Sequence, residues 1–366
     1  MITGVHLLQY ELPFRVPVQA GDGLHEVRSG LLLGLVDDSG ITGWGEAAPL
    51  PGWSGDSFPQ AEAGLRGLAL TIRERPRRPE RLSPTAASWL VRLPSAAAAL
   101  DTALLDLASQ RAGVSLAEHL AAGRAWAKGV AVNALIAGES AADVSAAGAG
   151  ARREGFGAFK LKLGGRTIED DIERVAALRS AIGPDASLRL DAGGRWTSDE
   201  AVRILAALVV YDIEYVEDPV ADLDALVQLA MATEIPLAAD ALLARSADPL
   251  AMVSTALIDV FVLKPGALGG LSMAAAIAAR AADRGRRVVV TSFLESAIGL
   301  TAAVHLAAAL PGDGYASGLA TSYLFAENVA EPPAIVTGTI RVPEGPGLGV
   351  GPSEIGPSDL AEGGAR

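Results

Sequence analysis

The stretch from Ala158 to Gly270 decides the fold of this chain. It contains five short apolar runs, and each of them ends in a charged residue. They read Phe159-Lys160-Leu161-Lys162, Arg189-Leu190-Asp191, Val216-Glu217-Asp218-Pro219, Ala239-Asp240 and Leu263-Lys264-Pro265-Gly266. From Lys162 onward the charged ends are separated by 29, 26, 23 and 24 residues. A strand, a helix and their loops occupy about that length, so the pattern predicts repeated βα units.

The same alternation continues on both sides of this stretch. The expected strands are 130–136, 158–163, 188–191, 213–217, 236–240, 260–264, 288–292 and 315–317. Because the carboxyl ends of the strands form one ring in a closed (β/α)₈ barrel, the charged residues are expected to meet at the face where such barrels carry their chemistry. The sequence therefore predicts an α/β fold with a modified, TIM-like (β/α)₈ barrel.

Several helices of the predicted barrel carry terminal signals. Thr167 is expected to cap a helix that Gly183 and the proline after it end. Thr197 and Glu200 have the spacing of a capping box for the next helix. Further upstream, Ser95 is expected to cap an Ala/Leu-rich helix.

The first ninety or so residues predict a small α+β unit that caps the barrel. Strands are expected at 2–12 and 28–47, the second folding into a hairpin around Asp37-Asp38-Ser39-Gly40. Helices are expected at 57–75 and 83–92. The loops around 20–27 and 49–56 are either plain connections or a lid over the barrel mouth that selects the ligand.

Three regions follow from this pattern. The predicted division is a capping domain at 1–94, a barrel at 95–329 and a C-terminal segment at 330–366 that returns to the cap, with a strand expected at 338–342.

Composition excludes several classes of function. The chain has 366 residues, 30 Lys and Arg and 43 Asp and Glu, so its net charge of −13 argues against binding nucleic acid or an anionic membrane. It has no cysteine, which excludes disulfides and thiolate metal sites, and its four histidines are scattered. The first residues lack the basic and apolar regions of a signal peptide, so a cytoplasmic protein is expected. The pattern does not indicate whether a homo-oligomer forms.

Three carboxylates at successive strand ends predict a metal site. Asp191, Glu217 and Asp240 supply hard oxygen ligands, and no histidine lies near them in the sequence. Such ligands suit Mg²⁺ or Mn²⁺ and disfavour zinc. A bound cation can stabilise the negative charge that forms when a carboxylate substrate loses its α-proton.

Lysines at the neighbouring strand ends are suited to receive that proton. Lys160 and Lys162 stand two residues apart, so both are expected on the inner face of one strand, and Lys264 is expected across the ring. The alternative is an inward network of ion pairs without catalysis. That alternative suits any one of these residues alone better than the whole set.

These motifs resemble the enolase superfamily, in the branch of muconate-cycloisomerase-like enzymes. The resemblance runs over nearly the whole chain, from Gly43-Trp44-Gly45-Glu46 through the Lys160-Leu161-Lys162 motif to Lys264-Pro265 and the stretch 338–343. Within that branch the chain looks most like the o-succinylbenzoate synthases of menaquinone biosynthesis. The segments 48–54 and 291–300 carry this finer likeness.

The resemblance implies a reaction and roles for the residues. It implies that Mg²⁺ on Asp191, Glu217 and Asp240 binds the carboxylate of 2-succinyl-6-hydroxy-2,4-cyclohexadiene-1-carboxylate. Lys162 would remove the α-proton and assist loss of the hydroxyl as water in a syn elimination. Lys160 would help place the carboxylate, and Lys264 would steady the anion. The residues expected near the substrate are Arg189, Ser292, Glu295 and Ser296, with Ser292 equally plausible as a turn residue.

Two positions depart from the pattern of this family. Gly193 stands where an asparagine is usual, and Ala241 where a glutamate is usual. Neither is a predicted metal ligand, but both remove polar groups from the neighbourhood of the metal site.

Other activities remain open. An N-acylamino-acid racemase or dipeptide epimerase needs a base on each face of the substrate, and Lys162 with Lys264 can supply both. A non-catalytic metal-binding scaffold is the alternative from another class, and the complete set of lysines and carboxylates argues against it.

Overall fold

The computed structural model describes residues 1–20, 23–82, 90–255, 257–312, 314–353 and 358–359. An antiparallel sheet of four strands opens the chain, in the order β14-β1-β2-β3. Its strands are β1 (Ile2–Ala20), β2 (Gly23–Asp37), β3 (Thr42–Ala47) and β14 (Ser358–Asp359). The strands expected at 2–12 and 28–47 and the turn between β2 and β3 are confirmed, with β1 running eight residues further than expected.

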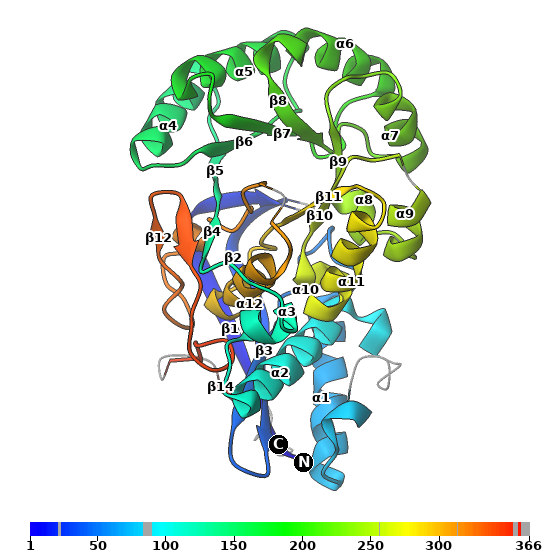
Figure 1. Cartoon of the computed structure of the whole chain (residues 1–366), viewed down its shortest axis with the longest axis vertical. Coiled ribbons are helices and arrows are strands. Elements are labelled where there is room, and N and C mark those ends of the chain that lie inside the picture. Colours follow the sequence, from blue (N-terminus) through cyan, green and yellow to red (C-terminus); the bar gives the residue numbers. More distant parts are fainter. Residues whose placement is uncertain (21–22, 83–89, 256, 313, 354–357, 360–366) are drawn as a thin grey trace.

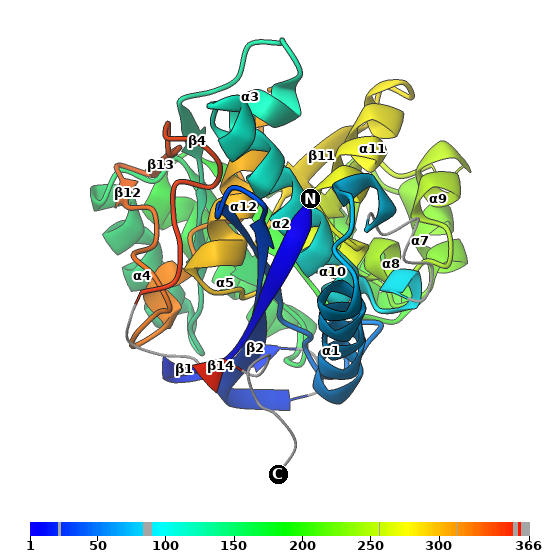
Figure 2. The same cartoon turned by 90° about the horizontal axis from the view of Figure 1, so that it is seen from below.

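Both faces of β2 are buried over residues 30–35, which explains its run of leucines. Leu31, Leu33 and Leu35 point into a core beneath α1 (Phe58–Glu74) and α2 (Pro94–Ala112), whereas Leu32 joins the core of the barrel. Successive side chains of a strand point to opposite faces, so one strand joins the two cores. Figure 2 shows the long ribbons of β1 and β2 with α1 at their side.

Close packing of β3 against α2 requires glycine. A Cβ atom on Gly43 would lie 2.3 Å from the carbonyl oxygen of Ala103, and one on Gly45 would lie 2.0 Å from that of Ala99. These distances are too short for any side chain, so the two glycines let the strand and the helix backbones approach each other.

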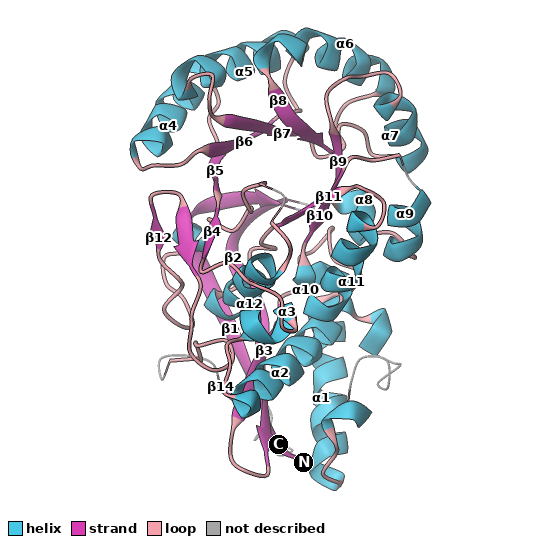
Figure 3. Ribbon diagram, viewed as in Figure 1, coloured by secondary structure: helices cyan, strands magenta, loops and turns pink. Residues whose placement is uncertain are grey.

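A parallel sheet of seven strands follows, in the order β11-β10-β9-β8-β7-β6-β5. Its strands are β5 (Asn133–Ile136), β6 (Ala158–Lys162), β7 (Ser187–Asp191), β8 (Ile213–Glu217), β9 (Leu237–Ala239), β10 (Val260–Leu263) and β11 (Arg287–Val290). Seven of the eight expected strands are therefore confirmed, with small shifts of their ends. The helices that connect these strands form an arc outside β5 to β9 (Figures 1 and 3).

The helices that accompany this sheet carry the expected caps. Thr167 accepts a hydrogen bond from Asp170 at the start of α5, and Thr197 with Glu200 forms the capping box of α6. The remaining helices are α3 (Leu116–Ala121), α4 (Ala141–Arg153), α5 (Ile168–Ile182), α6 (Ser198–Leu208), α7 (Leu223–Ala230), α8 (Ala241–Ala244), α9 (Pro249–Thr255), α10 (Pro265–Leu268), α11 (Leu271–Ala282) and α12 (Ala297–Ala309). None of the helices in the described ranges is both long enough and apolar enough to cross a bilayer.

The prediction of an eighth strand at 315–317 is wrong. Only Ser317 and Gly318 pair with the sheet, as isolated bridges to Val132 and Thr291. Ser317 exchanges backbone hydrogen bonds with Ala131 and Asn133, and Gly318 with Val290 and Ser292, at 2.7–3.0 Å. Glycines bracket this stretch and interrupt a regular strand, so two residues close the barrel in place of a strand.

The segment expected as one strand at 130–136 is divided in two. β4 (Gly129–Ala131) pairs with β13 (Thr339–Arg341), and β12 (Ile335–Val336) completes this small antiparallel sheet. The strand expected at 338–342 therefore exists but lies against β4, whereas β14 is the part of the C-terminal segment that pairs with β1. The division into three regions stays a prediction.

Ser95 does not cap α2. The helix begins at Pro94, a residue favoured at the first helical position because it needs no N–H partner there. The carboxylate of Asp56 accepts hydrogen bonds from the backbone N–H groups of Ser95 and Ala96 and from the Ser95 hydroxyl. A residue from the loop between β3 and α1 therefore provides the cap. The helix expected at 83–92 falls mostly outside the described residues, and Leu90–Arg92 forms a single 3₁₀ turn.

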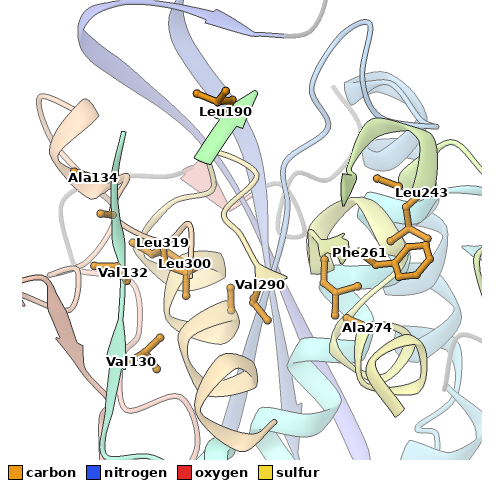
Figure 4. Close-up of a cluster of buried hydrophobic side chains, with 14 of the residues drawn as sticks. Val130, Val132, Ala134, Leu190, Leu243, Phe261, Ala274, Val290, Leu300 and Leu319 are labelled. Atoms are coloured by element: carbon orange, nitrogen blue, oxygen red, sulfur yellow. The ribbon is translucent and has the colours of Figure 1, made fainter. Parts of the chain in front are cut away.

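The main core lies between the barrel strands and the helices around them. Figure 4 shows Val130, Val132 and Ala134 along β4 and β5, with Leu300 of α12 and Leu319 close to them. Phe261 and Val290 contribute from β10 and β11. This core holds the strand ends in a fixed ring, which the functional site requires.

His305 is a buried polar group that ties the C-terminal segment to the helices. It lies on α12 with no exposed surface. Its Nδ1 accepts the N–H of Ala117, at 3.1 Å, and its Nε2 lies 3.0 Å from the carbonyl oxygen of Leu348. Burial lowers the pKa of His305 from 6.5 to about 4. The imidazole is therefore neutral in the folded protein at neutral pH.

This arrangement predicts a loss of stability in weak acid. Between pH 6.5 and about 4 the unfolded chain binds a proton at His305 that the folded chain does not, so the free energy of unfolding falls as the pH falls through that range. The full contribution is about 3 kcal/mol. The variant His305→Gln keeps a donor and an acceptor without titrating. Urea unfolding at several pH values should show a shallower acid slope for the variant, and parallel curves for the two proteins would contradict the prediction.

Candidate active site

Five of the six predicted catalytic and metal-binding residues contact an oppositely charged partner at the carboxyl ends of the barrel strands. Lys160 of β6 donates to Glu217 of β8 at 2.5 Å and lies 3.2 Å from Asp191 of β7. Lys264, which follows β10, is paired with Asp240, which follows β9. The parallel register aligns Lys162 with Asp191 and Asp191 with Glu217. The tertiary fold thus brings together residues that are far apart in the sequence.

The electrostatics show that these groups form one cluster. Burial opposes the charge on Lys160, but Asp191 and Glu217 raise the pKa of its ammonium well above the ordinary value. Burial also opposes the charge on Asp191, but Lys160, Lys162 and Lys264 together lower its pKa. Burial raises the pKa of Glu217, since that carboxylate has no exposed surface and lies near Asp191. The charge of Lys162 therefore acts on this cluster, although its side chain is exposed.

The residues present fit a divalent cation by their chemistry. Within the described ranges no three acidic or histidine side chains come together as a ready metal centre, because Lys160 and Lys264 pair with the carboxylates. However, Glu217 Oε1 is buried and has no hydrogen-bond partner among the described residues. An orphaned carboxylate oxygen between two further carboxylates suits a hard cation such as Mg²⁺. The ligand roles of Asp191, Glu217 and Asp240 stay predictions.

Arg189 lies apart from this cluster. It stands in register with Lys160, but its guanidinium turns to Glu214 at the start of β8 and to the carbonyl oxygen of Ala316. Its side chain has no exposed surface and lies 5.0 Å from the ring of Tyr215. The structure therefore places Arg189 inside the barrel, where it holds the stretch that replaces the eighth strand. Its contact with substrate stays a prediction.

The other three residues expected near the substrate lie between β11 and α12. Ser292 donates to Glu295 at 2.9 Å, and Ser296 caps α12 by accepting the N–H of Ile298. Ser296 also donates to Glu46 of β3, at 2.5 Å. These contacts hold the loop after β11 in place, and contact of the three residues with substrate stays a prediction.

Glu46 joins the cap to the barrel. Its carboxylate accepts hydrogen bonds from the backbone N–H groups of Ser296 and Gly299, both at 2.8 Å, and from the hydroxyl of Tyr10. A carboxylate at the N-terminus of α12 also interacts favourably with the helix dipole. Glu46 belongs to the motif Gly43-Trp44-Gly45-Glu46, but this role leaves no signal in the sequence, because an acid at the end of a strand does not reveal its distant partner.

Asp218 orients the backbone next to Asp240. Its carboxylate accepts the N–H groups of Asp240 and Ala241, at 3.1 and 2.7 Å. Although Ala241 stands where the family usually has a glutamate, its backbone N–H therefore still binds the Asp218 carboxylate. The departure at Gly193 has a φ of 58°, a conformation that asparagine also adopts, so either residue suits this turn.

The cap loop after β3 reaches the cluster. The ring of Trp53 lies 4.7 Å from Lys264 Nζ and 4.8 Å from the ring of Phe293, which follows β11. An aromatic residue from the cap thus stands beside a predicted catalytic lysine and packs on an aromatic residue from the barrel. This contact supports the expectation that the loop at 49–56 borders the ligand.

Two family descriptions match the chain. Residues 142–355 match the family described as enolase C-terminal domain-like, and residues 2–107 match the one described as MenC, N-terminal domain.

Curated relatives match part of the chain. Over 216 residues it is 41% identical to an o-succinylbenzoate synthase of Mycobacterium tuberculosis (strain H37Rv), a match that covers 58% of this chain and 64% of that protein. Over 176 residues it is 40% identical to an o-succinylbenzoate synthase of Thermobifida fusca, covering 48% of this chain and 55% of that protein. The chain thus spans less than two thirds of the length of these relatives.

The fold matches a solved structure over nearly its whole length. That structure is a dipeptide epimerase from Enterococcus faecalis in complex with Mg and the dipeptide L-Leu-L-Tyr. The TM-score is 0.87 at 26% identity, and the match covers 95% of this chain and 99% of that one.

Proposed function

The chain belongs to the enolase C-terminal domain-like family, and on that premise we propose that it is an enzyme that removes the proton α to a carboxylate of a small molecule. The reaction proposed is the syn dehydration of 2-succinyl-6-hydroxy-2,4-cyclohexadiene-1-carboxylate to 2-succinylbenzoate. The o-succinylbenzoate synthases at about 40% identity support this substrate. The enolase resemblance inferred from the motifs is confirmed.

The observation that carries the proposal is the cluster of lysines and carboxylates at the carboxyl ends of the strands. Lys160 contacts Glu217 and Asp191 there, and Lys264 contacts Asp240. Opposite charges concentrated at the mouth of a barrel suit a carboxylate substrate and the anion that it forms.

Each residue has a proposed part in the reaction. Lys162 takes the α-proton on its Nζ and returns a proton to the hydroxyl, which leaves as water while the ring becomes aromatic. Lys160 orients the carboxylate, and Lys264 stabilises the anion from the other face. Asp191, Glu217 and Asp240 would hold Mg²⁺. Bound Mg²⁺ supplies positive charge that stabilises the anion left when the proton departs.

The test is direct. Purified protein with Mg²⁺ and the cyclohexadiene substrate should show an ultraviolet increase from the aromatic product, and a chelator should stop it. An absence of turnover under saturating substrate would remove this reaction and leave the fold assignment unchanged.

A racemase or epimerase is the second candidate, and the match to a dipeptide epimerase favours it. Such a reaction needs a base on each face of the substrate, which Lys162 and Lys264 can provide. Incubation of an N-acylamino acid or a dipeptide with the protein in heavy water distinguishes the two, because only a racemase washes deuterium into the recovered substrate.

Replacing Lys264 separates the two activities. Lys264→Arg keeps the positive charge but removes a usable base, because arginine does not lose its proton. We expect the variant to lose racemisation completely and to retain part of the dehydration, which requires one base. Measured rates for both reactions, with the wild type as reference, check this. An equal and complete loss of both would contradict separate roles for the two lysines.

A further inference from the structure

Arg28 on β2 connects two loops that border the site. It is 3% exposed. Its Nε donates to the carbonyl oxygen of Leu294 at 3.0 Å, and its Nη2 donates to that of Phe293 at 3.3 Å, both in the loop after β11. Its Nη1 donates to the carbonyl oxygen of Pro49 at 2.6 Å and its Nη2 to that of Ala48, both in the cap loop. One guanidinium thus binds a loop from the cap and a loop from the barrel.

The chemistry of this contact requires arginine. Among the described residues, the hydrogen bonds of its guanidinium all end on main-chain carbonyl oxygens. A buried cation is costly unless its donors are satisfied, and the flat fork of arginine directs five N–H groups to separate acceptors. Lysine has a single ammonium group, so it cannot reach both loops in the same way.

The backbone of the barrel loop is strained at Leu294. Its φ is 59°, a conformation that a bulky side chain rarely adopts. The N–H of Leu294 donates to the hydroxyl of Ser292 at 2.9 Å, and its carbonyl accepts from Arg28. Both backbone polar groups of this strained residue are therefore hydrogen-bonded.

The two loops carry the aromatic side chains beside Lys264. The cap loop turns through backbone hydrogen bonds from Trp53 and Ser54 to Leu50, which place the Trp53 ring on Phe293 and beside Lys264 Nζ. Arg28 therefore binds backbone carbonyl groups in both of the loops that carry these rings.

We infer that Arg28 is a positioning residue that holds the cap loop against the barrel loop and so sets the aromatic wall of the substrate site beside Lys264. It acts through Trp53 and Phe293 and not on the reacting atoms. The inference rests on the proposed function only for its kinetic readout, since the loop contact itself does not depend on the substrate.

The test compares Arg28→Lys with a matched control. Arg179 of α5 also donates to main-chain carbonyl oxygens, at 2.7–2.9 Å. Its four acceptors lie in loops that do not carry the lysine cluster, and they belong to Gly183, Ala186, Tyr211 and Asp212. Arg179→Lys therefore makes the same chemical change without touching the cap. Arg28→Gln, which also removes the buried charge, is prepared in parallel.

Two measurements are made on the full chain. Hydrogen exchange should become faster at residues 50–54 and 293–296 in both Arg28 variants and stay unchanged there in Arg179→Lys. KM for the cyclohexadiene substrate should rise about tenfold or more with a smaller change in kcat, because the wall binds substrate and does not transfer protons. Mg²⁺ affinity, measured by calorimetry, should match that of the wild type.

These measurements distinguish a failure of this inference from a failure of the proposed reaction. If the hydrogen-exchange rates and the KM of Arg28→Lys match those of Arg179→Lys, the inference is wrong. Loss of folding in both Arg28 variants, with Arg179→Lys folded, would also overturn it, because Arg28 would then serve stability alone. If the wild type does not turn over the substrate, the proposed reaction fails, and the exchange measurement still decides the role of Arg28.

Discussion

Lys162→Ala is expected to lower kcat for the dehydration by about 10² to 10⁴-fold, the usual contribution of a general base. Lys162 is exposed, and its Nζ makes no hydrogen bond within the described part of the chain, so the variant should fold like the wild type. Its charge acts on Asp191, but Lys160 keeps its direct contact with that carboxylate. The loss should therefore appear in the rate far more than in the folding.

The measurement is the rate of appearance of aromatic product at saturating substrate and Mg²⁺, with thermal unfolding recorded in parallel. Lys128→Ala is the matched control, because Lys128 is also an exposed lysine and lies on the ring of Trp126, paired with Glu344. That variant should keep the wild-type rate. A Lys162→Ala protein as active as the wild type would exclude Lys162 as the base.

Glu217→Gln is expected to abolish measurable Mg²⁺ binding and to lower turnover by about 10³-fold or more, since a metal cofactor provides several kcal/mol of transition-state stabilisation. Glutamine keeps the size of the side chain and removes its charge. Glu217 is fully buried, lies near Asp191 and pairs with Lys160 through Oε2. Its Oε1 has no partner among the described residues, so this oxygen is available for a cation. Calorimetric titration with Mg²⁺ and the turnover assay measure the two effects.

Glu214→Gln is the control on the same strand. Glu214 lies three residues earlier on β8 and pairs with Arg189 at the other end of the barrel. Its replacement should lower thermal stability, because the buried guanidinium loses its partner, and leave Mg²⁺ affinity unchanged. If the two variants bound Mg²⁺ equally, Glu217 would not be a ligand.

Local signals in the sequence accounted for much of the fold. The helix caps at Thr167 and Thr197 lie where they were expected, because capping depends on residues three positions apart. Seven strands of the barrel were found from short apolar runs. The eighth was not a strand, since glycines break it and contacts with Val290 and Ala131, distant in the sequence, replace its hydrogen bonds.

The assignment of Ser95 as a cap failed for a related reason. A serine before an alanine-rich run is a common N-cap, but Pro94 had already begun the helix and Asp56 supplied the carboxylate from another segment. A cap that comes from 39 residues away leaves no local signal.

The sequence by itself determined the repeating βα pattern and the meeting of lysines with acids at one face. These follow from periodicity and spacing, which act over one βα unit at a time. The family followed from the resemblance of its motifs. Only the tertiary structure decided that Arg189 turns inward to Glu214, that Glu46 caps α12, and that Arg28 fastens two loops. The physical reason is that a side chain's partners across an interface depend on how complete elements pack, and no spacing along the chain encodes that packing.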